Sequence, residues 1–196
     1  MKRFLWGCVA CLAFCASPAF AGRWVAGPYA FTFRTGATNG AKTQRPDGST
    51  PKAPMDLICF DGSEEAWIET VVPYNAAGTN WVCDYQWVMS TTSTNKFCMT
   101  MANTVCKDNQ DCQDLTPGNA TTTALDGVGT ADRLETDTAA AFAIRDVGGA
   151  ADCSAGNCAG NILLIKFSGG TAGGCTQTTG AEEVCLKKVD CSYNEP

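Results

Sequence analysis

Ten cysteines follow residue 21 of this chain, and they limit its fold more than any other feature of the sequence. An even number of cysteines in an exported chain is typical of a disulfide framework. If all ten are paired, each of the five bridges stabilises the fold by about 2–4 kcal/mol. We therefore predict that reduction unfolds or loosens the protein. The predicted disulfide cysteines are Cys59, Cys83, Cys98, Cys106, Cys112, Cys153, Cys158, Cys175, Cys185 and Cys191.

Some of these cysteines lie close together in sequence. Only four or five residues stand inside each of the spans Cys106–Cys112, Cys153–Cys158 and Cys185–Cys191. Most of these inner residues are polar or favour turns, which suits a small loop closed by a disulfide. We predict local pairing in all three spans, and the spacing leaves the other pairings open.

Residues 1–21 have the pattern of a signal peptide. Lys2 and Arg3 form a basic start, residues 4–14 are mostly apolar, and Ala19-Phe20-Ala21 matches a cleavage site. Disulfides persist in the compartments to which such a leader directs a chain. We predict a secreted, periplasmic or cell-surface protein whose mature chain begins at Gly22.

Two alternatives for the leader remain open. It could stay attached as an anchor, or Cys15 could carry a lipid, because residues 12–15 resemble a lipobox with Phe14 in place of a small residue. Beyond the leader, the apolar runs at residues 139–144 and 162–165 are far short of the roughly 18–20 residues that span a bilayer. We expect no transmembrane segment after the leader.

The mature chain is acidic. The leader holds two of the 14 basic residues and none of the 20 acidic ones, so 12 minus 20 leaves a net charge of −8. Lys187 and Lys188 form its longest basic run. Because phosphate backbones are bound by clustered cations, we do not expect a nucleic acid among the partners.

The first part of the mature chain, residues 22–115, has the pattern of β-strands. Residues 81–89 alternate so that Trp81, Cys83, Tyr85, Trp87 and Met89 share one face, and Tyr29, Phe31 and Phe33 alternate in the same way. Residues 22–28 read as a loose lead-in, and the polar, Pro- and Gly-containing residues 36–54 read as a long loop. The predicted strands are 29–34, 57–60, 66–72, 81–89, 97–102 and 104–106. We predict a hairpin between 66–72 and 81–89.

The second part, residues 116–196, contains more small residues. In residues 116–160, 25 of 45 are Ala, Gly or Thr, so this stretch buries little apolar surface per residue. Asp132 and Glu135 have the spacing of a capping box, which predicts a helix that ends near Gly148. A further strand is predicted at 162–167, and residues 184–189 are predicted to form a last strand or a helical turn.

These patterns predict a mostly β fold. We expect a disulfide-stapled β-sandwich or small sheet domain with an irregular, Gly/Ala/Thr-rich C-terminal half. Residues 22–115 and 116–196 are expected to belong to the same domain.

The chain contains no histidine. This excludes Ser-His-Asp and Cys-His nucleophile systems and histidine-ligated metals. After residue 21 the sequence also lacks C-x-x-C, G-x-S-x-G and P-loop motifs; a C-x-x-C spacing occurs only at Cys8–Cys11, inside the predicted leader. We do not expect an enzyme. The catalytic alternative is a hydrolase that uses two carboxylates, drawn from Asp61, Glu64, Glu65 and Glu69.

Residues 124–135 resemble the calcium-binding loop of EF-hand, dockerin and thrombospondin type-3 repeats. On that pattern Asp126, Asp132 and Glu135 stand at ligand positions and Gly129 at the sharp turn. Ala124 and Val128 stand where carboxylates are expected. The resemblance implies calcium as the one candidate cofactor, with a plain loop or the helix cap as the alternatives.

The combination of a leader, many cysteines and no histidine predicts a non-catalytic structural or assembly protein of a surface, matrix or appendage. Its partners would be further copies or other surface proteins, with residues 29–34 pairing to a sheet edge. The alternative is a secreted module that binds a glycan or a protein, for which an exposed Trp24, Trp67, Trp81 or Trp87 would be the discriminating feature. A protease inhibitor is a further alternative.

Overall fold

The computed structural model describes residues 22–33, 41–45, 55–60, 64–74, 76, 81–89, 96–108, 118–126, 129, 133–144, 153, 158–170 and 184–194. The predicted leader and the calcium-loop residue Asp132 lie outside these ranges, as do Cys112 and Cys175. Among the described residues, no helix has the length and apolarity that crossing a membrane requires.

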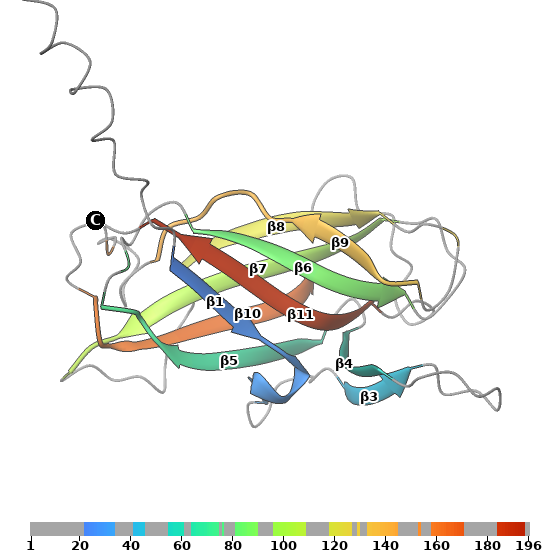
Figure 1. Cartoon of the computed structure of the whole chain (residues 1–196), viewed down its shortest axis with the longest axis horizontal. Helices are drawn as coiled ribbons and strands as arrows, with labels where there is room; N and C mark the ends of the chain where they lie inside the picture. The colour runs from blue at the N-terminus through green and yellow to red at the C-terminus, as the bar shows by residue number, and fades with distance from the viewer. Residues whose placement is uncertain are drawn as a thin grey trace, which may run out of the picture.

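The fold is an antiparallel β-sandwich, as the sequence predicts (Figure 1). Sheet A has the order β3-β4-β11-β6-β9, with β1 added beside β11, and sheet B has the order β2-β5-β10-β7-β8. The strands of sheet A are β1 (Gly22–Ala26), β3 (Ala41–Arg45), β4 (Met55–Phe60), β6 (Val82–Met89), β9 (Glu135–Thr138) and β11 (Val184–Tyr193). The strands of sheet B are β2 (Phe31–Thr32), β5 (Glu65–Val71), β7 (Lys96–Cys106), β8 (Gly118–Asp126) and β10 (Ile162–Gly170).

The core lies between the two sheets and is rich in aromatic side chains. The rings of Tyr85 in sheet A and Phe167 in sheet B meet edge to face, with centroids 6.2 Å apart. The Tyr85 hydroxyl lies 3.6 Å from the Met101 sulfur of sheet B, and burial raises the pKa of that hydroxyl. Alternation explains this core, because every second side chain of each strand points inward.

The alternation predicted for residues 81–89 is confirmed, since Cys83, Tyr85, Trp87 and Met89 are all buried. The predicted hairpin is wrong. Residues 65–71 pair with β10 in sheet B, whereas residues 82–89 pair with β11 and β9 in sheet A. The two segments therefore belong to different sheets of the sandwich, although they follow each other in the sequence.

The segment that follows the predicted leader also differs from the prediction. Residues 22–26 form β1, which pairs with β11 over five residues instead of being a loose lead-in (Figure 1). Pro28 begins a short 3₁₀ helix, Pro28–Ala30, which shortens the expected strand to Phe31–Thr32. Phe31 is buried as a result, while Tyr29 and Phe33 are exposed. Because Phe31 and Thr32 pair with β5 of the same chain, this segment already has a strand partner.

Two further predictions are wrong. Strand β3 forms within the predicted long loop by pairing with β4. The predicted helix is absent from the described residues 133–144, where β9 pairs with β6 and Phe142 forms a bridge with Trp81. Both segments have weak patterns of their own, and pairing with a neighbouring strand decides their conformation.

Three disulfides are described. Cys153–Cys158 is local, as its spacing predicts. The predicted Cys185–Cys191 loop is wrong, because both residues lie on β11 and bridge to other strands. Cys59–Cys185 joins β4 to β11, and Cys83–Cys191 joins β6 to β11. Each of these two bridges links residues that stand directly opposite each other in the sheet. Cys98 and Cys106 are also disulfide-bonded.

Candidate functional site

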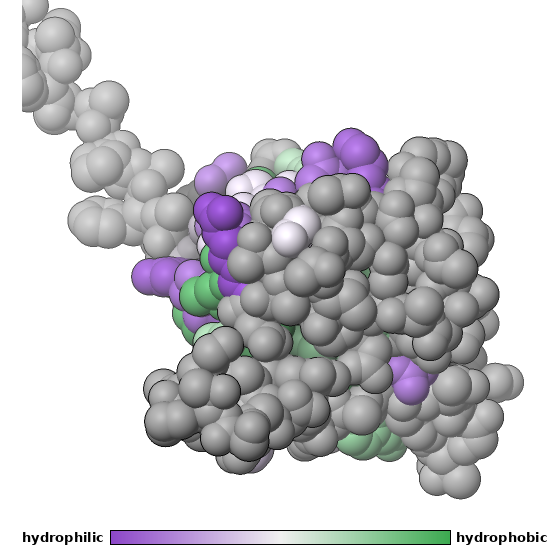
Figure 2. Space-filling view, turned by 90° about the vertical axis from the view of Figure 1, so that its right-hand side faces the viewer, coloured by the Kyte–Doolittle hydropathy of each residue, from purple (hydrophilic) through white to green (hydrophobic). Residues whose placement is uncertain are grey.

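The tryptophans do not provide an open stacking surface in the described part of the chain. Trp67, Trp81 and Trp87 are buried, and Trp24 is partly buried against the core. The face that Trp81 and Trp87 share by alternation is therefore the buried one. The exposed aromatic side chains are Tyr29, Phe33 and Tyr74. In Figure 2 both hydrophilic and hydrophobic described residues are visible at one end of the molecule.

The strongest candidate surface is the outer face of sheet B. Leu163, Ile165 and Phe167 belong to the core, so the alternating residues of β10 point outward. Cross-strand pairing places outward residues of the neighbouring strands in rows beside them. Among the described residues, the outer face of sheet B comprises Thr32, Glu65, Trp67, Glu69, Val71, Lys96, Cys98, Thr100, Ala102, Thr104, Cys106, Thr122, Ala124, Asp126, Ile162, Leu164, Lys166 and Ser168. The members that are buried are Trp67, Cys98, Ala102, Thr104 and Cys106, so the accessible part of this face lies mainly on β5, β10 and β8 and at Thr100.

A charged pair and an aromatic ring stand together on this face. Trp67 Nε1 donates a hydrogen bond to Glu65 Oε1 at 3.0 Å. Lys166 Nζ lies 3.3 Å from the other carboxylate oxygen, Oε2, and 5.9 Å from the centroid of the Trp67 ring. Side-chain exposure is 20% for Glu65 and 28% for Lys166, so both remain accessible. Trp67 therefore serves as a buried support that orients the Glu65 carboxylate.

Hydroxyl groups extend the same row across the sheet. Glu65 stands opposite Ser168, which stands opposite Thr100, which in turn pairs with Thr122 on β8. The Thr100 and Thr122 hydroxyl oxygens are 3.0 Å apart and share a hydrogen bond. One row thus carries a carboxylate and three hydroxyl groups on four adjacent strands.

The other end of this face is apolar. Val71 and Ile162 stand opposite each other and are 50% and 42% exposed. Val71 is four residues from Trp67, which corresponds to about 13 Å along the strand. Tyr74 lies just beyond, 84% exposed, with its ring against Gly160. The outer face of sheet B is therefore polar at the end with Glu65 and apolar at the end with Val71 and Ile162.

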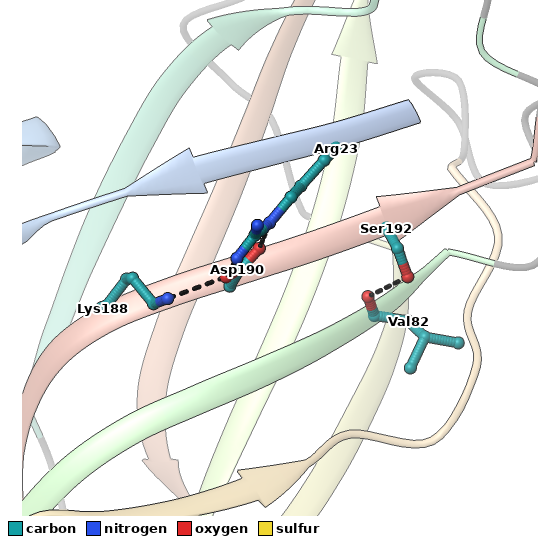
Figure 3. A network of polar contacts seen from close by, with 5 residues as sticks. All are labelled: Arg23, Val82, Lys188, Asp190 and Ser192. Atoms are coloured by element: carbon teal, nitrogen blue, oxygen red, sulfur yellow. Dashed lines mark hydrogen bonds and ion pairs between the residues drawn. The ribbon is translucent and has the colours of Figure 1, made fainter. Parts of the chain in front are cut away.

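The outer face of sheet A carries a second polar cluster, shown in Figure 3. Arg23 Nε donates to Asp190 Oδ1 at 2.6 Å, and its Nη2 pairs with Oδ2. Lys188 Nζ lies 2.8 Å from Oδ2 of the same residue. The hydrogen bond from Arg23, with Lys188 nearby, holds the pKa of Asp190 well below its usual range. This cluster ties β1 to β11.

The calcium prediction concerns residues on different strands. Asp126 at the end of β8 pairs with Lys96 at 3.0 Å, and Glu135 on β9 pairs with Arg133 at 2.6 Å. Among the described residues, no three His, Cys, Asp or Glu side chains are grouped to hold a metal ion. Because Asp132 is outside the described residues, the calcium site stays a prediction. Calcium titration tests it: the prediction requires a rise in melting temperature that Asp126→Ala abolishes.

Asp137 is an acidic residue near this position that the sequence pattern does not single out. Its carboxylate accepts a hydrogen bond from Trp87 Nε1 at 2.7 Å. Burial raises the pKa of Asp137, and the negative charges of Asp126 and Glu135 raise it further. Pairing of β9 with β6 brings Asp137 beside Trp87, and no local sequence pattern predicts that pairing.

The carboxylates considered for hydrolysis are placed differently. Glu65 and Glu69 share the outward side of β5, and Glu65 is engaged by Lys166 and Trp67. Glu64 precedes the strand, and Asp61 lies outside the described residues. Both oxygens of the Glu65 carboxylate are engaged by neighbouring side chains, Oε1 by Trp67 and Oε2 by Lys166. The described geometry therefore does not favour Glu65 as a catalytic acid.

No family model and no curated protein matches this chain. Among solved structures, it is similar to a cycloisomaltooligosaccharide glucanotransferase from Paenibacillus sp., with 9% identity, a TM-score of 0.45, and coverage of 88% of this chain but only 18% of that enzyme. It is also similar to a xylan-binding module, CBM15, with 12% identity, a TM-score of 0.41 and coverage of 89% and 100%. The adhesin domain K2 of Lys-gingipain has 8% identity, a TM-score of 0.42 and coverage of 87% and 99%. At these identities and scores, the likenesses carry no functional argument.

Proposed function

We propose that this protein is an exported, non-catalytic module that binds carbohydrate on the outer face of sheet B. The observation that carries the proposal is the row of Glu65, Ser168, Thr100 and Thr122 beside Lys166. A sugar offers many hydroxyl groups, each both a donor and an acceptor of hydrogen bonds. A row of carboxylate, ammonium and hydroxyl groups complements such a ligand.

The apolar end of the face supports the same proposal. Sugar rings also have apolar C–H faces, and Val71 and Ile162 are exposed next to each other for contact with them. The separation of about 13 Å between this end and Trp67 suits an oligosaccharide rather than a single sugar. Tyr74 provides an exposed aromatic ring beyond the apolar end.

The scaffold supports recognition rather than catalysis. Disulfides join β11 to β4 and to β6, and antiparallel pairing without register shifts holds β5, β10 and β7 of sheet B together. A rigid sheet fixes the positions of its outward side chains, which lowers the ordering cost of binding. The disulfides also favour an oxidising compartment, secreted, periplasmic or at the cell surface.

Isothermal titration calorimetry of the mature protein, residues 22–196, with a panel of oligosaccharides tests this proposal. For a ligand found in the panel, Glu65→Ala should weaken the affinity about tenfold, because it removes a charged hydrogen-bond acceptor. Ser168→Ala should give a smaller loss. Thr138→Val on the outer face of sheet A is the matched control, since it also removes an exposed hydroxyl.

The result that overturns the proposal is an absence of binding across the panel, or binding that Glu65→Ala and Ser168→Ala leave unchanged. Circular dichroism and urea denaturation of each variant separate a local loss of contacts from unfolding. The structural or assembly function expected from the sequence predicts large species in size-exclusion chromatography with light scattering. A monomer that binds oligosaccharide favours the module.

A further inference from the structure

The charges on the outer face of sheet B are unequal. Lys166 is engaged by Glu65 at 3.3 Å, so these two charges largely compensate each other. Glu69 stands on the same face, one outward position along β5 from Trp67, and is exposed. Its cross-strand neighbour is the apolar Leu164. The described residues of this face therefore leave one carboxylate in excess.

The position of Glu69 matters because it separates the two ends of the face. The polar row with Glu65 lies on one side, and the exposed pair of Val71 and Ile162 lies on the other. A ligand that covers both ends must pass over or beside Glu69. The cation nearest in the rows of the face, Lys166, already pairs with Glu65.

We infer that the outer face of sheet B selects uncharged glycans and rejects carboxylated or sulfated ones, an inference that rests on the proposed function. An anionic group placed on this face meets the negative charge of the Glu69 carboxylate. The anionic group can form an ion pair with Lys166 only by displacing Glu65. The Glu65 carboxylate then loses its cation and is left beside Trp67. The net charge of −8 of the mature chain adds repulsion at longer range.

A glycan array that carries neutral glycans next to their sialylated, sulfated and uronic-acid counterparts tests this selectivity. We expect the wild-type protein to bind neutral members about tenfold or more tightly than the matched acidic ones, since like-charge contacts are strongly unfavourable. Glu69→Lys should reduce that ratio several-fold by admitting the acidic members. Asp84→Asn removes an exposed carboxylate from the outer face of sheet A and should leave the ratio unchanged.

The outcomes separate the two proposals. Binding of acidic glycans as tight as that of their neutral counterparts overturns the selectivity and leaves carbohydrate binding in place. A ratio that Glu69→Lys does not change also overturns the role given to Glu69. If neither neutral nor acidic glycans bind, the proposed function itself fails.

Discussion

Cys83 on β6 and Cys191 on β11 stand directly opposite each other, with their Cα atoms 4.0 Å apart, and their disulfide joins residues 108 positions apart in sequence. The bond lies in the core between the sheets. The second bridge of β11, Cys59–Cys185, lies on the outer side of sheet A in a separate apolar cluster with Leu57 and Val88. Strand β11 is thus linked covalently to β4 and to β6, one link on each side of the sheet.

Loop length predicts how much each bridge stabilises the protein. Removing Cys83–Cys191 by double replacement with Ala should lower the free energy of unfolding by about 3–4 kcal/mol, because with Cys59–Cys185 intact the bridge closes a loop of about 30 residues in the unfolded chain. Removing Cys153–Cys158, which spans five positions, should cost about 2 kcal/mol on the same grounds. Urea denaturation of the two double variants measures the difference. Equal losses would contradict this ranking.

The Arg23–Asp190 pair predicts how stability depends on pH. The folded state lowers the pKa of Asp190, so its contribution is complete above the usual carboxyl pKa of about 4. That contribution decreases as the pH falls further toward the lowered value, because the unfolded state then binds the extra proton. Asp190→Asn should therefore destabilise the protein at pH 7 and change it little in strong acid.

Urea denaturation of wild type and Asp190→Asn at several pH values measures this effect. Asp126→Asn is the control, because its pair with Lys96 is exposed on both sides and such surface pairs contribute little. A difference between wild type and Asp190→Asn that stays constant down to strong acid would refute the coupling of Asp190 to β1.

We predict that the substitution Gly160→Ala destabilises the protein. Its φ of +76° is left-handed, and a Cβ there would lie 2.7 Å from the Tyr74 hydroxyl oxygen. Gly160→Ala should cost about 1–2 kcal/mol from the backbone alone. Gly27→Ala is the matched control, since a Cβ at Gly27 meets nothing within 4 Å and its φ is −96°.

Thermal or urea denaturation distinguishes the two glycine variants. Adding Tyr74→Ala to Gly160→Ala should recover the part of the loss that comes from the close contact and leave the backbone part. An equal effect of Gly160→Ala and Gly27→Ala would show that neither the conformation nor the contact matters.

Much of the fold follows from local patterns. The alternation over residues 81–89 predicts both a strand and its buried face, because one periodicity produces both. The same holds for residues 162–167, where Leu163, Ile165 and Phe167 are buried. The even number of cysteines likewise predicts disulfides from the sequence alone, because this prediction uses only the number of cysteines and not which cysteines pair.

Partner choice could not be read from the sequence. Cys185 and Cys191 are close in sequence, but an extended strand holds them apart and each faces a cysteine of a different neighbour. Residues 22–26 have no strong pattern, and β11 at the far end of the chain makes them a strand. The face with Glu65, Ser168 and Thr100 likewise combines residues from strands remote in sequence. Each of these features depends on long-range pairing.

The most direct test of the central claim is NMR mapping of the mature protein with the tightest-binding oligosaccharide from the panel. The account predicts that the perturbed backbone amides gather on β5, β10 and β7, near Glu65, Lys166 and Val71. The amides around Arg23 and Asp190 on sheet A should stay unchanged. Perturbations centred on sheet A, or none with any oligosaccharide, would contradict carbohydrate binding on the outer face of sheet B.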